Sequence, residues 1–239
     1  NSTVCFAITF YVYLQSRSVF ATGLISGIFL ALTASTGIWF GSLVDHYSKK
    51  TMMQVSAAVS ATLYAAAFAV YQVASPETFT DPTSITLWTL IVLLMFGVIA
   101  GNIRTIALPT LVTVLIAEET RDRANGLVGT TSGVSFLVTS VISGVLVAID
   151  GMFWVLVLAI VVLAGAVLHL ALVPVSERGA APVEPTETRT ETRTEIRTVD
   201  LRGTVRVVRE VPGLMALILF STFNNLLGGI FMALMDAYG

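Results

Sequence analysis

Residues 18–44 read SVFATGLISGIFLALTASTGIWFGSLV, and none of these 27 residues is charged. A helix needs about 20 mainly apolar residues to cross the hydrocarbon core of a bilayer. The apolar residues of this stretch fall on all sides of such a helix rather than in one stripe, which is typical of helices surrounded by lipid and by each other. The stretch is therefore predicted to be a transmembrane helix.

Six further uncharged runs show the same pattern. They cover residues 1–16, 51–76, 82–103, 124–149, 151–176 and 211–235. A signal peptide or a buried helix explains one such run, but not seven. We therefore predict an all-α, polytopic membrane protein with spans at 1–16, 19–41, 51–73, 85–107, 125–148, 152–173 and 214–235.

The composition supports this class and excludes others. Of the 239 residues, 55% are hydrophobic and 12% are charged, whereas a soluble domain averages about 25% charged residues. A single cysteine excludes a disulfide scaffold, and a net charge of −2 argues against binding of nucleic acid. The sequence shows no soluble-enzyme motif, phosphate loop or metal-ligand cluster, so we expect a protein that is not an enzyme and holds no cofactor or metal.

The positions of lysine and arginine predict the topology, because these residues concentrate in cytoplasmic loops. If residue 1 is cytoplasmic, the short inside loops hold four of them and the outside loops hold only Arg17. The four are Lys49, Lys50, Arg121 and Arg123, and seven more arginines lie in the long inside loop. We therefore place the amino end on the cytoplasmic side of the cell membrane.

The long loop differs in kind from the spans. Residues 177–210 hold seven arginines and seven acids, which is half of the 28 charges of the chain, and residues 186–198 read TETRTETRTEIRT. This repeat balances its own charge and has little to bury, which is typical of a solvated linker. We therefore predict three parts: a six-helix bundle at 1–173, a cytoplasmic linker at 174–213 with a short amphipathic helix (Leu201, Val205, Val208), and a seventh span within 214–239.

One loop motif resembles a known family. Residues 41–50, between spans two and three, read GSLVDHYSKK, which resembles the major facilitator superfamily signature G-x-L-a-D-r-x-G-r-k at the loop where that family carries it. The residues that match are Gly41, Leu43, Asp45, Lys49 and Lys50. The resemblance implies a secondary transporter that works by alternating access, with this motif as a latch between two helical bundles.

Other features extend the resemblance over the whole chain. Six spans, a charged loop and a seventh span match the family's layout of two six-helix bundles, each built of 3+3 inverted repeats. Residues 119–126, ETRDRANG, resemble the family's loop before span five. The combination is most similar to the bacterial drug and macrolide efflux branch. However, the proline of the antiporter motif is absent from span five, and the arginine usual in span four is replaced by Leu93.

The resemblance also suggests which residues line the substrate cavity, because spans one, four and seven do so in the family. The candidates are Tyr11, Gln15, Asn102, Arg104, Asn224 and Asn225. Arg104 is the only ionised residue within a predicted span. If span four ends later than predicted, Arg104 lies deep in the bilayer as a substrate or coupling residue, and if it ends earlier the side chain reaches the cytoplasm.

Two further sets of residues complete the prediction. Glycine pairs at G-x-x-x-G spacing allow close helix packing in membranes, and these are Gly23/Gly27, Gly37/Gly41, Gly97/Gly101 and Gly129/Gly133. No acid lies in the middle of a span, so Asp45 and Asp236 are the candidates in this chain for carrying a coupled proton.

The predicted function is export of a small amphipathic molecule by proton antiport in a bacterium. Its partners would be the lipid bilayer, the substrate, protons and a C-terminal half of the same protein beyond residue 239. Two alternatives stay open: an intramembrane serine hydrolase using Ser132 and His169, and a channel or non-transporting scaffold.

Overall fold

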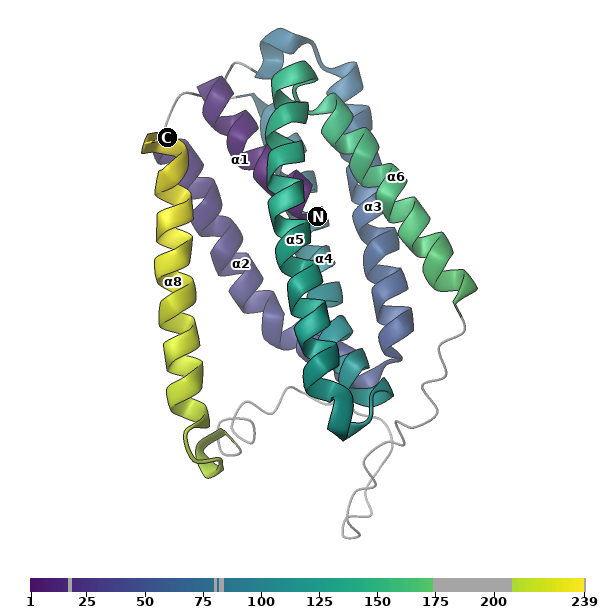
Figure 1. Ribbon diagram of the computed structural model, residues 1–239. Coiled ribbons are helices and arrows are strands. Elements are labelled where there is room, and N and C mark those ends of the chain that lie inside the picture. The colour runs from purple at the N-terminus through teal and green to yellow at the C-terminus, as the bar shows by residue number, and fades with distance from the viewer. Residues whose placement is uncertain (17–18, 80, 82–83, 174–207, 239) are drawn as a thin grey trace, which may run out of the picture. The chain divides into compact units, whose positions relative to one another are not determined.

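The computed structural model describes residues 1–16, 19–79, 81, 84–173 and 208–238, and every regular element in them is helical. The elements in chain order are α1 (Ser2–Ser16), α2 (Val19–His46), α3 (Lys49–Val73), the 3-10 helix η1 (Pro76–Phe79), α4 (Ile85–Leu115), α5 (Glu118–Asp150), α6 (Phe153–Leu172) and α8 (Leu214–Tyr238) (Figure 1). No strand occurs in this part of the chain. The predicted all-α, polytopic class is confirmed.

Five helices are long and apolar enough to cross a membrane. They are α2 (from Ile25), α3, α4, α5 and α6. The other two predicted spans correspond to shorter apolar stretches, Ser2–Leu14 in α1 and Leu214–Gly228 in α8. The 15 residues of α1 extend about 22 Å, and the helix begins midway along the bundle, where Figure 1 marks the amino end.

Helix α4 differs most from its predicted bounds. We expected a break at Pro109, but the helix continues through this proline to Leu115. Proline at position 109 removes the backbone N–H that would bond to the carbonyl of Thr105, and membrane helices tolerate such a loss. Two neighbouring hydroxyl groups bond within the same helix: Thr110 Oγ1 donates to the carbonyl of Ile106 at 2.9 Å, and Thr113 Oγ1 donates to the carbonyl of Pro109 at 3.0 Å. The predicted break is wrong, because α4 is one continuous helix of 31 residues.

The helices α2 to α6 alternate in direction, so the connections collect at two ends (Figure 1). One end holds the α2–α3 turn, the α4–α5 turn and the last turn of α6. We call it the basic end, because Lys49, Lys50, Arg121 and Arg123 lie there. The opposite end holds η1 and the α5–α6 turn at Gly151, whose φ of 56° is a conformation that favours glycine.

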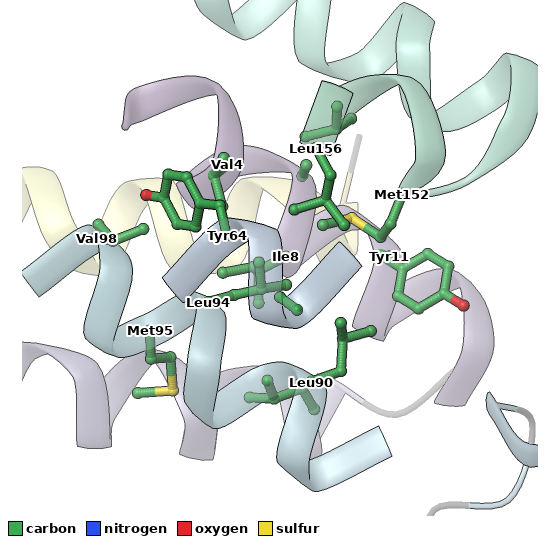
Figure 2. Close-up of a cluster of buried hydrophobic side chains, with 14 of the residues drawn as sticks. Val4, Ile8, Tyr11, Tyr64, Leu90, Leu94, Met95, Val98, Met152 and Leu156 are labelled. Carbon is green, nitrogen blue, oxygen red and sulfur yellow. The ribbon is translucent and has the colours of Figure 1, made fainter. Parts of the chain in front are cut away.

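The core of the bundle forms where α1, α3, α4 and α6 meet. Figure 2 shows Val4 and Ile8 of α1 beside Tyr64 of α3 and Leu94 of α4, all members of one buried cluster. Met152 and Leu156, at the start of α6, are fully buried in the same cluster. The core therefore fixes α3 and α4 side by side, which positions the site described below.

Two helices contribute little to this core. In α2 and α5 only about a tenth of the most apolar window is buried, against half in α4. Large apolar side chains such as Trp39 on α2 and Val141 on α5 are more than half exposed within this unit. Exposed apolar surface on this scale is what a helix bundle presents to lipid or to another bundle.

The chain divides into two compact units, Asn1–Pro182 and Val183–Gly239. In the second unit, α8 follows a turn at Gly213, and Asn225 Nδ2 donates to the carbonyl of Ser221 at 2.8 Å within the same helix. The charged repeat and most of the predicted amphipathic helix lie outside the described residues.

Candidate functional site

Helices α3 and α4 pack closely at Gly97. A Cβ added to Gly97 would overlap the ring of Tyr64, so only glycine allows this contact. One turn before Tyr64 in α3, Ser60 Oγ donates to the carbonyl of Gly97 at 2.8 Å. Ser60 is fully buried. Small residues at a membrane helix interface allow such close packing and hydrogen bonding across it.

Arg104 lies on the same face of α4, one turn beyond Ala100. Its Nη1 donates to Ser56 Oγ at 2.9 Å, and Ser56 Oγ donates its own proton to the carbonyl of Ala100 at 2.6 Å. The guanidinium is thus held by a neutral hydroxyl whose orientation is set by the backbone of α4. Hydrogen bonds to a charged group are stronger than those between neutral groups, so this contact fixes the orientation of the Arg104 guanidinium.

The guanidinium of Arg104 points away from the basic end. Its partner Ser56 is bonded to Ala100, which precedes Arg104 by four residues and so lies about 6 Å further from the end of α4. Side chains on a helix lean toward its amino terminus, which is consistent with this direction. The side chain therefore does not extend toward the loops at the basic end.

A second set of polar contacts adjoins the first. Tyr64 Oη donates to Asn1 Oδ1 at 3.1 Å, and Asn1 Nδ2 donates to the carbonyl of Val98 at 3.5 Å. We call Asn1, Ser56, Ser60, Tyr64 and Arg104 the polar seam. It joins Asn1, the residue before α1, to α3 and α4.

The sequence indicates Arg104 as a site residue but not its partners. Ser56, Ser60 and Tyr64 recur every four residues, which places them on one face of α3. This spacing was visible in the sequence. However, serines in membrane helices usually bond to their own backbone, as Thr62 does to Ala58, so spacing alone did not indicate a contact with α4.

Tyr11 lies apart from the polar seam. It is ten residues further along α1 than Asn1, which is about 15 Å, and its ring packs edge-on against Phe79 of η1 at the opposite end. Its side chain is buried, with 6% exposed. The structure does not bring Tyr11 and Arg104 together, and the side chain of Gln15 lies outside the described residues.

Asn102 projects from a different face of α4 than Arg104, because two residues correspond to about 200° around a helix. Its Nδ2 is buried and has no hydrogen-bond partner among the described residues. Asn224 and Asn225 are exposed on α8, which belongs to the second unit. The predicted grouping of these residues around one cavity stays a prediction.

The predicted latch residues lie at the basic end, around the end of α2 and the start of α3. Asp45 is exposed there. Lys49 Nζ donates to the backbone carbonyl of Asp45 at 3.5 Å, and the imidazole Nδ1 of His46 lies 2.7 Å from the carbonyl of Ser42. Cationic side chains near the last carbonyls of a helix stabilise its end.

The same kind of contact recurs at the ends of α4 and α6. Arg121 Nη2 donates to the carbonyl of Thr113 at 3.2 Å, and Lys50 Nζ donates to the carbonyl of Val173 at 2.6 Å. Basic side chains therefore contact the final carbonyls of all three helices that end at the basic end. Leu43 packs beside Val44, in a small cluster apart from the main core.

The predicted glycine pairs divide into two groups. A Cβ at Gly97 would overlap Tyr64, and one at Gly101 would overlap the side chain of Asn1. A Cβ at Gly129 or Gly133, by contrast, would meet nothing within 4 Å, and the same holds for the two pairs on α2. Within the described residues, helix packing at Gly129 and Gly133 is therefore not observed, because the outward face of α5 has no neighbour there.

Nothing in the geometry favours the alternative hydrolase. Ser132 Oγ donates to the carbonyl of Val128 in its own helix at 2.8 Å, and both Ser132 and His169 are exposed. No hydrogen bond joins them within the described ranges. In those same ranges, no group of three His, Cys, Asp or Glu residues could hold a metal ion.

The fold and the seam define a helical membrane bundle with a charged residue held between two of its helices. The sequence matches the family model of the Major Facilitator Superfamily over residues 1–239. The chain therefore belongs to the major facilitator superfamily and is a multi-pass membrane transporter. No curated protein and no solved structure matches it.

Proposed function

We propose that this transporter exports a small amphipathic molecule, of the drug or macrolide-like class, by proton antiport through alternating access. Membership of the superfamily supports transport, and the similarity of its loop motifs to the efflux branch supports the direction. The proposed setting is the cell membrane of a bacterium, with the amino end in the cytoplasm.

The observation that carries this proposal is the polar seam. A charged side chain inside a membrane-spanning helix is costly and marks a substrate or ion pathway. Arg104 is such a residue, and Ser56 holds it pointing away from the basic end. We therefore assign Arg104 to the substrate path, with Asn102, Tyr11, Gln15, Asn224 and Asn225 as further candidates.

The latch at the basic end would control which side of the membrane is open. Gly41, Leu43, Asp45, Lys49 and Lys50 form the loop motif, and the exposed carboxylate of Asp45 is available to another part of the protein. Asp45 and Asp236 are also the proposed proton carriers. The side chain of Asp236 lies outside the described residues.

The test uses the full-length protein reconstituted in vesicles that contain a pH-sensitive dye. Macrolides, cationic dyes and siderophore-like chelators are added in turn after a pH gradient is imposed. A substrate of a proton antiporter should dissipate the gradient and accumulate in the vesicles. Uptake with no change in the gradient would contradict proton coupling, and neither response for any compound would contradict the proposed function.

The role of the latch is tested with a matched pair of acids at the basic end. Asp45→Asn should lower the transport rate at least tenfold at an equal amount of protein in the membrane. Asp122→Asn removes an exposed acid at the same end of the bundle and should change the rate less than twofold. Equal rates in the two variants would remove Asp45 from both proposed roles.

A further inference from the structure

The charges inside the bundle are unbalanced. In the described parts of α1 to α6, the acids lie at or near helix ends, as Asp45, Asp150 and Glu118 do. Arg104 is eleven residues from the end of α4 and is the only ionised side chain in the middle of a described helix. Among the described residues of the first unit, the interior therefore carries one charged side chain, that of Arg104, with no acidic side chain beside it.

The contacts of Arg104 leave its charge uncompensated. A guanidinium has five N–H donors, and in the described residues one hydrogen bond is formed, from Nη1 to the hydroxyl of Ser56. A hydroxyl is neutral and orients the group without neutralising it. The side chain is only partly buried, so part of the guanidinium stays accessible to a ligand.

A carboxylate or phosphate is the chemistry that satisfies such a group. Arginine binds either anion through two parallel N–H···O bonds, and its planar fork is already oriented here by Ser56 and Ala100. An amine would be repelled by the same charge at the same place. The site thus discriminates by the sign of the charge of the molecule that enters.

We propose that Arg104 binds an acidic group of the transported molecule, so that the substrates of this transporter are amphipathic anions. This inference rests on the proposed transport function and narrows its substrate class from the drug- or macrolide-like molecules named above to acidic ones, so basic macrolides and cationic dyes would not be substrates. Ser56 is a positioning residue in this site, because it holds the guanidinium and would not itself contact the substrate.

The test compares three probes of similar shape that differ in charge: 1-naphthoate, 1-naphthamide and 1-naphthylmethylammonium. Thermal unfolding of the full-length protein is followed in nanodiscs of zwitterionic lipid. Naphthoate should raise the midpoint of unfolding in a saturable way, and the other two probes should not. Equal stabilisation by the amide would overturn the proposal. The absence of any stabilisation by naphthoate would overturn it too, because another group of the protein would then already neutralise Arg104.

Variants assign the effect to Arg104. Arg104→Gln should weaken naphthoate binding more than tenfold, and Arg104→Lys should retain part of it. The matched control is Arg123→Gln, which removes an exposed arginine at the basic end and should bind naphthoate as the unchanged protein does. If Arg104→Gln folds, judged by its own unfolding midpoint, and binds naphthoate normally, the proposal is wrong.

A lipid phosphate is the other source of an acidic group. Repeating the experiment in nanodiscs with phosphatidylglycerol separates the two: stabilisation by this lipid that disappears in Arg104→Gln would assign Arg104 to a headgroup and overturn a substrate role. The vesicle assay separates this proposal from the transport function. If naphthoate binds through Arg104 but is not transported, only the proposed transport function is contradicted. If neutral or cationic compounds are transported and Arg104→Gln does not change their rate, only the anion site is contradicted.

Discussion

Lys50 Nζ donates a hydrogen bond of 2.6 Å to the backbone carbonyl of Val173, which joins the first turn of α3 to the end of α6 across 123 residues of sequence. The carbonyl belongs to the residue that caps α6, where the negative end of the helix dipole favours a cation. A residue that the sequence motif assigns to a latch therefore also contacts α6 within its own bundle.

Replacing Lys50 by methionine is expected to lower the free energy of unfolding by about 1 kcal/mol, because one hydrogen bond to a helix end is lost from a partly buried site. The measurement is thermal unfolding of the full-length protein in detergent. Lys50→Arg should retain most of the stability, since it keeps a cationic donor. A Lys50→Met variant as stable as the unchanged protein would contradict a stabilising role for this contact.

Gly97→Ala is expected to destabilise the bundle by roughly 2 kcal/mol, because overpacking a close contact forces side chains or backbone to move. The added methyl would meet the ring of Tyr64, which is fully buried. The matched control is Gly129→Ala, where a Cβ meets nothing within 4 Å. That change should be neutral or slightly stabilising, because alanine is the better helix former.

The contact with Tyr64 can be tested directly. Combining Gly97→Ala with Tyr64→Leu should cost less than the sum of the two single changes, since the smaller side chain relieves the overlap. Strict additivity would show that the cost of Gly97→Ala arises elsewhere.

Gly151→Ala is expected to cost about 1–3 kcal/mol through backbone strain, since L-residues rarely adopt its φ of 56°. Gly151 ends α5, and its N–H donates to the carbonyl of Val147 at 3.0 Å. The control is Gly165→Ala in the middle of α6, where a Cβ has open space. Unfolding midpoints should fall for the first variant only, and a fall of equal size in both would argue against strain at the turn.

Ser132→Ala is expected to leave both stability and transport nearly unchanged, because Ser132 Oγ bonds only to its own helix in the described structure. The measurements are the unfolding midpoint and the transport rate of a compound identified in the vesicle assay. Loss of an ester-hydrolysing activity in this variant, with the fold intact, would instead support the serine hydrolase.

The polar seam contains one residue that the sequence indicates and partners that it leaves unspecified. Arg104 was identifiable because a charge within an apolar run is rare. Its depth was not, because Pro109 suggested an early end to α4, whereas the helix continues through this proline to Leu115. The partner Ser56 could not be assigned from the sequence, since a serine hydroxyl bonds as readily to its own helix as to a neighbouring one.

The sequence by itself determined that this protein is a helical membrane bundle, because the length and spacing of uncharged runs are set by the thickness of the bilayer. The loop motif likewise indicated the family to which the chain belongs. Only the tertiary structure decided which glycine pair packs, which way Arg104 points and what holds it. These properties depend on the rotation of each helix about its axis and on its register against its neighbours, and an all-apolar helix surface leaves both unspecified until the helices pack.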